Sequence, residues 1–486
     1  MFTIFTNLLE KFSNVFATTG EYTAKDIEFI QNEIYQFFNS KKRADMMTGE
    51  RYYVNNHDIL QRKIMAIGEG GELQEIKHLP NNKVIDNQYA KMVDQKNNYL
   101  LGKPPTFKSE NEEYTEKINL IFGPSFLRTL KAIGEDSLNC GLGWLYIHYD
   151  DNGDLAFKRV RPHELIPIWR DAEHTILEMA IRIYPVLHHQ DNQDNQEKVI
   201  YKVEVFDKTG ISYFEYDDAF KPAEPYHADY FTVNDGETAN GYNWSKIPLV
   251  AFKYNNKETP LINRVKSLQD GINVMLSDFE NNMQENANNT ILVLKNYEGE
   301  NLGEFRRNLA TFRAISIHAS SEGGGGVDTL KIDVNPDNYQ LILAYLKKAL
   351  IENAMGYDAK DDRMAGNPNQ MNIQSMYSDI DLDANGTEVE YKAAMEQVIW
   401  FVNSHLANTG QGDFTGENVD IIFNRDVLIN ESEAIANLRQ SVGLLSTETI
   451  IAQHPFVTDP QAELERLKKE QLEAMKMMDY QDLGAE

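Results

Sequence analysis

The sequence predicts a mixed α+β protein made of several domains, and three observations support this class. The chain has 486 residues, which is more than one small core organises. Apolar residues recur at helical spacing near both ends, whereas the period changes to two between 142 and 256. A stripe of apolar residues at steps of three and four then runs along 261–289, which is typical of a long helix.

Composition excludes several classes of function. Apolar residues make up 42% of the chain and charged residues 25%, which is ordinary for a globular protein. The 47 basic and 75 acidic residues give a net charge of −28, which disfavours tight sequence-reading DNA binding and attraction to anionic lipid. A single cysteine, Cys140, excludes a disulfide framework and a multi-cysteine metal site.

The first quarter of the chain is predicted to be helical. Residues 1–24 carry an apolar stripe at steps of three and four, which indicates a docking helix with no charge-free run able to span a bilayer. Residues 21–67 follow, with Thr23 as the expected N-cap. A further helix is predicted over 84–101, where Gly102 and the prolines after it end the pattern.

The middle of the chain is predicted to form strands and then a long helical pair. An acidic turn at 150–154 separates two alternating runs and indicates a hairpin, and further strands are expected at 179–184, 199–206 and 211–216. Thr259-Pro260 and Asn335-Pro336 each combine a capping side chain with a first-turn proline, so each is expected to start a helix.

The first of these helices carries the stripe noted above. Because a lone helical pair leaves such a stripe half covered, we expect it to form an oligomer interface. Its six predicted interface residues are Leu261, Val265, Leu268, Ile272, Met275 and Phe279.

The rest of the chain divides at its glycines and prolines. A compact module is predicted between the two helices, over 290–334, and a polar stretch follows them over 357–370. Helices are then expected at 371–406, 432–444, 447–454 and from 461 onward.

No motif makes a convincing active site, and no metal or cofactor is predicted. The glycine run 323–326 lacks the Lys and Ser or Thr of a phosphate-binding loop. An acidic string that begins at Asp381 has Lys392 where a calcium loop needs glutamate. A metal-dependent nuclease that uses Asp361, Asp362 and Asp379 stays open as an alternative, although neighbouring acids in a polar loop are usually only solvated.

Several segments, taken in order, resemble the portal proteins of long-tailed double-stranded DNA phages of Gram-positive hosts. A portal is the head–tail connector at one vertex of the capsid, and it is not an enzyme. The segments that carry the resemblance are Asn87 to Lys96, Tyr99 to Pro104, Gly143 to Asp150, Lys246 to Pro248, Val293 to Tyr297, Tyr377 to Leu382 and Phe423 to Arg425.

The resemblance implies a portal-protein fold with an α/β wing, a long helical stem, a small α/β clip and a helical crown. Carried over by segment, the domains are an N-terminal helical arm (1–24), the wing (25–256), the first stem helix (257–289), the clip (290–334), the second stem helix (335–356), the tunnel loop (357–370), a long wing helix with a return strand (371–429) and the crown (430–486).

The resemblance also implies partners and a place. The chain is expected to form a cyclic homo-oligomer, usually dodecameric in the virion, at the portal vertex after assembly in the host cytoplasm. Double-stranded DNA passes through the channel without sequence specificity, and no membrane is involved. The expected protein partners are the terminase large subunit, a head-completion or adaptor protein, and the major capsid and scaffolding proteins. Another virion structural protein, such as a scaffold-dependent capsid component, stays open as a further alternative.

Two sets of side chains are expected to act in this setting. The tunnel-loop set, predicted to lie in the DNA channel, is Lys360, Asp361, Asp362, Arg363, Asn367 and Asn369. Of these, Lys360 and Arg363 are expected to contact phosphates transiently, unless they only pair with Asp358, Asp361 or Asp362. The clip set, predicted to dock the packaging motor, is Glu304, Arg306, Arg307 and Arg313, although pairing of these arginines with Glu300 and Glu304 is nearly as plausible. Residues 358–390 contain eight acidic and two basic side chains, so we expect an acidic channel wall that repels the duplex.

Overall fold

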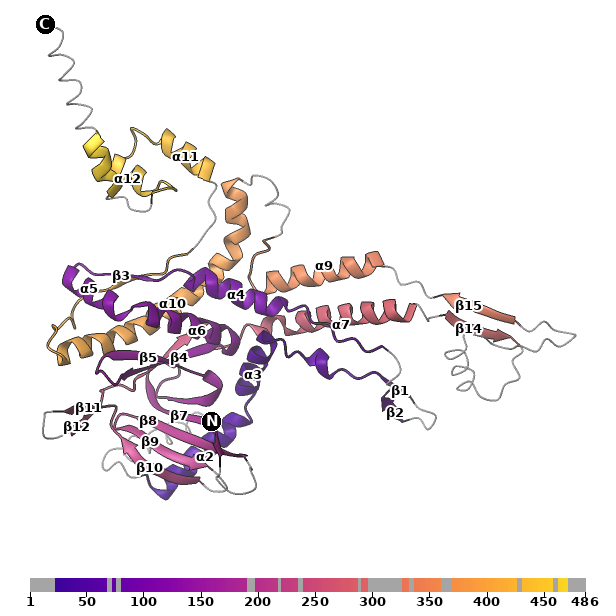
Figure 1. Ribbon diagram of the computed structural model, residues 1–486, viewed down its shortest axis with the longest axis horizontal. Coiled ribbons are helices and arrows are strands. Elements are labelled where there is room, and N and C mark those ends of the chain that lie inside the picture. The colour runs from indigo at the N-terminus through magenta and orange to yellow at the C-terminus, as the bar shows by residue number, and fades with distance from the viewer. Residues whose placement is uncertain are drawn as a thin grey trace, which may run out of the picture. The chain divides into compact units, whose positions relative to one another are not determined.

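The computed structural model shows a chain that divides into two compact units (Figure 1). Unit 1 comprises residues 1–40, 94–259 and 355–486, and unit 2 comprises residues 41–93 and 260–354. The structure describes residues 22–67, 72–75, 80–189, 197–216, 220–234, 239–286, 290–295, 326–331, 336–359, 369–425, 431–457 and 462–470. The arm predicted over 1–24 therefore lies almost wholly outside the described residues.

The main core of unit 1 surrounds an antiparallel sheet of three strands in the order β13-β4-β5. Its strands are Leu249–Lys253 (β13), Leu142–Tyr149 (β4) and Leu155–Val160 (β5). Helix α6 (Pro124–Cys140) packs on β4 and β5, and helix α10 (Gln370–Asn408) packs on β13. Trp144, in the central strand, is fully buried at the centre of this core.

The β4–β5 hairpin confirms the strand pair predicted on either side of an acidic turn. The Asp150 carboxylate accepts hydrogen bonds from the amides of Asn152 and Asp154, each at 2.9 Å. Gly153 adopts a φ of 83°, a left-handed conformation that glycine enters without a steric penalty. The polar residues of the turn thus fix the register of the strands beside it.

A second sheet of unit 1 has five antiparallel strands in the order β10-β9-β8-β7-β6. Its strands are Leu165–Trp169 (β6), Leu177–His189 (β7), Glu197–Asp207 (β8), Gly210–Tyr216 (β9) and Phe220–Ala228 (β10). Helix α2 (Ala24–Phe38) packs on β6 and β7 and buries Ile30 against their apolar face. Thr23 caps this helix in a reciprocal capping box with Asp26, which confirms the predicted cap.

Smaller elements complete unit 1. The chain continues from unit 2 into unit 1 within helix α4 (Gln88–Leu101). The remaining elements are β3 (Thr106–Lys108), α5 (Glu112–Ile121), η2 (Pro162–Glu164), β11 (Phe231–Asn234), β12 (Ala239–Tyr242), β16 (Asp420–Ile422), α11 (Glu431–Gln440) and α12 (Thr447–Ala452). Residues 462–470 are also helical.

Unit 2 contains two long helices that lie side by side, α7 and α9 (Figure 1). The elements of unit 2 are α3 (Lys41–Tyr53), η1 (Asp58–Gln61), β1 (Met65–Ile67), β2 (Leu73–Glu75), α7 (Ile262–Asn286), β14 (Thr290–Lys295), β15 (Gly326–Lys331) and α9 (Pro336–Asn353). Strands β14 and β15 pair antiparallel, and they are the described part of the predicted module 290–334.

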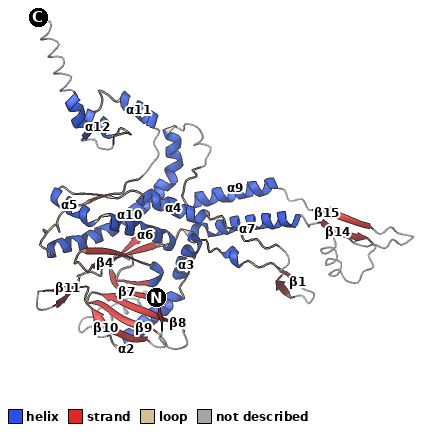
Figure 2. Cartoon of the chain, viewed as in Figure 1, coloured by secondary structure: helices blue, strands red, loops and turns tan. Residues whose placement is uncertain are grey.

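The structure confirms the α+β class and corrects several predicted boundaries. Figure 2 shows that the chain contains both helices and strands, and most of the strands fall between residues 142 and 253. The stretch 21–67 is not one helix, because the chain breaks between α2 and α3 and turns into η1 and β1 after α3. The helix predicted over 84–101 begins only at Gln88, and α7 begins at Ile262, three residues after the predicted cap Thr259.

Candidate functional site

Most of the predicted DNA and motor contacts lie outside the described residues. This holds for Lys360, Asp361, Asp362, Arg363 and Asn367 of the tunnel-loop set, and for Glu304, Arg306, Arg307 and Arg313 of the clip set. Asn369 is described, and its side chain accepts a hydrogen bond from the amide of Asn372 at 2.8 Å. Asn369 is therefore the N-cap of α10.

Some acidic residues of the segment predicted as a channel wall form ion pairs and hydrogen bonds within unit 1. Asp381 accepts a hydrogen bond from Tyr99 and lies 3.3 Å from the Arg425 guanidinium. Glu388 pairs with Arg425 and, at 2.8 Å, with Lys392. These acids are neutralised by the chain itself, so the predicted excess of negative charge is smaller than the sequence count. Asp379, one of the three acids of the nuclease alternative, is exposed on α10.

A buried ion pair stands at the centre of this region. The Lys96 ammonium lies 2.7 Å from the Asp383 carboxylate, and the two side chains are 4% and 10% exposed. Lys96 also donates to the carbonyl oxygen of Met355 at 3.1 Å, and Tyr254 donates to Asp383 at 2.9 Å. Because both charges are paired and further hydrogen-bonded, the site avoids the cost of an isolated buried charge.

Half of the six residues predicted as an oligomer interface are buried within the chain, which corrects the prediction for those three. Leu261, Val265 and Ile272 are fully buried within the chain, so they have no surface to offer a second copy. Leu268, Met275 and Phe279 are half-buried, and the Phe279 ring lies 5.2 Å from that of Tyr339 in α9. The stripe is covered mainly because α9 and other segments of unit 2 pack around α7.

A group of exposed apolar side chains in unit 2 lies on α9. Leu341 is 54% exposed, Ile342 45% and Tyr345 65%. Their spacing places them next to one another on one side of the helix, and we call this set the α9 face. Exposed apolar residues grouped in this way are typical of a protein contact surface.

A row of polar residues on α7, which the sequence analysis missed, holds residues 82–89 along that helix. We call Gln269, Asn273, Ser277 and Asn281 the polar ladder. All four are buried, and they accept hydrogen bonds from four backbone amides. The amide of Asn82 bonds to Asn281 at 2.8 Å, that of Val84 to Ser277 at 3.0 Å, that of Asp86 to Asn273 at 3.2 Å, and that of Tyr89 to Gln269 at 2.9 Å.

The ladder has a sequence signal. Its members recur every fourth residue along α7, so they share one face of the helix. A buried polar row of this kind needs partners, and the backbone of an extended segment supplies them.

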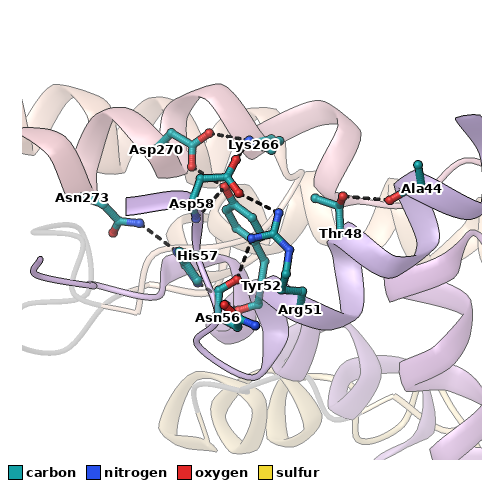
Figure 3. A network of polar contacts seen from close by, with 10 residues as sticks. All are labelled: Ala44, Thr48, Arg51, Tyr52, Asn56, His57, Asp58, Lys266, Asp270 and Asn273. Atoms are coloured by element: carbon teal, nitrogen blue, oxygen red, sulfur yellow. Dashed lines mark hydrogen bonds and ion pairs between the residues drawn. The ribbon is translucent and has the colours of Figure 1, made fainter. Parts of the chain in front are cut away.

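Asn273 joins the polar ladder to a network that includes a buried histidine (Figure 3). The Nε2 of His57 donates to the carbonyl oxygen of Tyr52 at 2.9 Å, and Asn273 donates to Nδ1 at 2.8 Å. The Asn273 oxygen is already occupied by the amides of Asp86 and Gln269, which fixes the orientation of its side chain. The network therefore accommodates only the neutral imidazole.

Four charged groups lie beside this histidine (Figure 3). Lys266 bridges Asp58 at 2.6 Å and Asp270 at 2.7 Å, and Arg51 lies 2.7 Å from Asp58. Tyr52 donates to Asp270 at 2.6 Å, and burial together with this bond raises the pKa of its hydroxyl to about 12. The two acids and two bases balance, so the cluster is a closed structural network.

We predict that mild acid destabilises unit 2 through His57. Burial lowers the pKa of the His57 imidazole below its ordinary value of 6.5, although Asp270 and Asp58 oppose this effect. Because the folded-state pKa is the lower one, the contribution of His57 to stability is complete above about pH 6.5 and falls as the pH drops from there toward the folded-state pKa. Hydrogen exchange of the amides of residues 82–89 should therefore accelerate as the pH falls below about 6.5, after correction for intrinsic rates.

The control for this prediction is His57→Gln, which cannot be protonated. This variant should exchange faster than the wild type at neutral pH but show no extra acceleration in the acid range. An equal acid response in both proteins would contradict the prediction.

The part of the chain that the structure describes contains no cluster of three or more His, Cys, Asp or Glu side chains placed to hold a metal ion. Within the same described residues, no helix combines the length and the apolar character that a membrane crossing requires.

The family model and the two curated relatives agree on one family. A family model described as "Phage portal protein, SPP1 Gp6-like" matches residues 33–477. The portal protein of Bacillus phage SPP1 is 27% identical over 441 residues, which cover 90% of this chain and 86% of that protein. The portal protein of Clostridium phage phiCD119 is 25% identical over 452 residues, covering 91% and 96%. Among solved structures, the neck of an empty GTA particle computed with C6 symmetry aligns with a TM-score of 0.38 and 11% identity, covering 85% of this chain and 92% of that one.

Proposed function

The chain belongs to the phage portal protein family of the SPP1 Gp6-like type, and from this membership we propose that it closes into a ring whose channel carries double-stranded DNA into and out of the capsid. It is a component of the virion. The match over residues 33–477 is the observation that carries the proposal, since it spans both units of the structure.

The stoichiometry, the partners and the DNA contacts that we propose are carried over from the portal protein family. The ring is a dodecamer in the virion, and it assembles in the host cytoplasm with scaffolding and major capsid proteins. The module 290–334 docks the terminase large subunit and later a head-completion protein. The connection between α9 and α10 contacts DNA weakly through Lys360 and Arg363, without sequence specificity, since lasting phosphate contacts would hold the duplex in place.

The α9 face supports the ring. We propose that it packs against unit 2 of the next copy, where the apolar side chain of Val274 in α7 is 39% exposed. Such a contact is heterologous, because two different surfaces meet, and repetition of a heterologous contact closes a ring when the rotation allows. Burial of Leu341 and Tyr345 between copies then removes the apolar side chains that a single chain leaves in water.

The test is a pair of charge substitutions on the α9 face. The double variant Leu341→Glu with Tyr345→Glu should remain a monomer at micromolar concentration, where the wild type forms rings seen by mass photometry and end-on electron micrographs. Both side chains are exposed in one chain, so thermal unfolding of the monomer should change little. The matched control is Leu120→Glu, because Leu120 is 83% exposed on α5 in unit 1.

Rings of wild-type mass in the double variant would remove the α9 face from the proposal. A wild-type protein that stays monomeric at all salt concentrations would count against the ring itself. Magnesium-dependent DNA cleavage by that monomer would instead favour the nuclease alternative.

A further inference from the structure

After α9 the chain continues through a short segment, residues 355–359, whose backbone is hydrogen-bonded to side chains of α4. Helix α9 ends at Asn353, and Met355 then adopts a φ of 53°. A left-handed conformation costs a residue with a Cβ about 1 kcal/mol or more, so it persists only where neighbouring contacts impose it. Residues 355–359 are described, and they lie in unit 1 together with α4 from Asp94 onward and α10.

Gln95 of α4 holds this segment through both of its amide atoms. Its Nε2 donates to the carbonyl oxygen of Tyr357 at 2.9 Å, and the amide of Tyr357 donates to its Oε1 at 3.0 Å. The side chain thus satisfies the donor and the acceptor of one backbone residue, as a neighbouring β-strand would. A paired contact of this kind fixes direction as well as position.

The neighbouring residue Lys96 fixes the segment two residues earlier. Lys96 donates to the carbonyl oxygen of Met355 at 3.1 Å, and it also pairs with Asp383 in the first half of α10. The Tyr357 ring lies 4.6 Å from the Tyr377 ring, which is stacked at 5.9 Å on Tyr99 of α4. Consecutive turns of α4 therefore contact both the exit from α9 and the beginning of α10.

We propose that Gln95 and Lys96 are positioning residues for DNA handling: they fix where and in which direction the chain enters the connection between α9 and α10. The inference rests on the proposed function, because it assumes that this connection contacts DNA. Neither residue touches DNA in this account. Their effect is to restrict the freedom of the segment that leads to the contacts, through the hydrogen bonds to Met355 and Tyr357.

The test compares three variants of α4 with the wild-type ring. Gln95→Leu keeps the length of the side chain and removes both hydrogen bonds, whereas Gln95→Glu keeps the acceptor for the Tyr357 amide and loses the donor. Asn98→Ala is the matched control, since Asn98 is exposed on the same helix and bonds only within it, to the carbonyl oxygen of Asp94. The readouts are hydrogen exchange of the Tyr357 amide, ring mass, melting temperature, and the DNA retained by particles assembled with each variant.

In Gln95→Leu, we expect exchange of the Tyr357 amide to rise about fivefold to tenfold, as the loss of one net hydrogen bond predicts. Retained DNA should fall, while ring mass and melting temperature stay near the wild-type values. The exchange rate of the Tyr357 amide in Gln95→Glu should lie between the rates in Gln95→Leu and in the wild type. Asn98→Ala should match the wild type in all four readouts. Unchanged exchange or unchanged DNA retention in Gln95→Leu would overturn the inference.

A parallel variant, Lys360→Ala with Arg363→Ala, separates this inference from the function on which it rests. If that variant loses DNA and Gln95→Leu does not, the positioning role is wrong and the proposed function stands. If neither variant changes the DNA retained, the proposed role of the connection fails, and the inference fails with it.

Discussion

Replacing Asp383 with leucine should lower the free energy of unfolding of unit 1 by about 3–5 kcal/mol, because the buried Lys96 ammonium then loses its counter-charge. The double variant Lys96→Met with Asp383→Leu should recover most of this loss, since it removes both charges and leaves apolar side chains of similar size. Urea unfolding followed by tryptophan fluorescence reports on the right unit: Trp144, Trp169, Trp244 and Trp400 are the four tryptophans of the chain, and all lie in unit 1.

The control for this cycle is Asp379→Leu, because Asp379 is exposed one turn earlier on the same helix. It should change the unfolding free energy by no more than about 0.5 kcal/mol. A loss below about 1 kcal/mol in Asp383→Leu would mean that the pair is solvated in the native protein, contrary to its burial here. A double variant as unstable as the single one would show that the other hydrogen bonds of Lys96 and Asp383 matter more than their charges.

Asn273→Leu should be the most destabilising single change in unit 2. The substitution leaves the buried Nδ1 of His57 and the part-buried amide of Asp86 without partners, and each such group costs roughly 1–3 kcal/mol. We therefore expect a loss of about 2–6 kcal/mol and release of residues 82–89 from α7. Hydrogen exchange of these amides is the direct measurement, since unit 2 contains no tryptophan.

Asn263→Leu is the control for the ladder, because Asn263 lies on the same helix but is exposed and bonds to Asp45 at the surface. It should leave the exchange of residues 82–89 unchanged. Equal protection of these amides in Asn273→Leu and the wild type would show that the ladder does not hold the segment.

Local signals in the sequence predicted much of the fold. The acidic turn at 150–154 defined a hairpin, Thr23 capped α2, and Pro336 opened α9, because each of these features depends on residues a few positions apart. The extended course of residues 82–87 could not be predicted in this way. Val84 and Ile85 fit a helical pattern locally, and only the polar ladder, nearly 200 residues later in the chain, selects the extended form.

The candidate sites show the same limit. An apolar stripe on α7 predicted a contact surface, but its period does not tell whether the partner is the same chain or another one, and Val265 is buried by the chain itself. Asp383 belonged to a predicted acidic wall, yet its partner Lys96 lies 287 residues away. A count of charges in one segment cannot reveal such a pairing, because both residues look solvated in their own neighbourhoods.

The polar ladder also determines how this part of the chain tolerates insertions and deletions. Two residues of extended chain advance about 6.6 Å, and four residues of helix advance about 6.0 Å, so the two spacings nearly coincide. The mismatch of about 0.6 Å per step therefore adds up to only about 1.2 Å over the two steps from Asn82 to Asp86. The last step already departs from the pattern, since three residues separate Asp86 from Tyr89 where the chain begins to coil into α4.

One added residue in 82–86 would turn the alternate amides away from α7, and one added residue within 269–281 would rotate the ladder by about 100°. Both stretches should therefore keep their lengths among relatives of this protein even where their residues change.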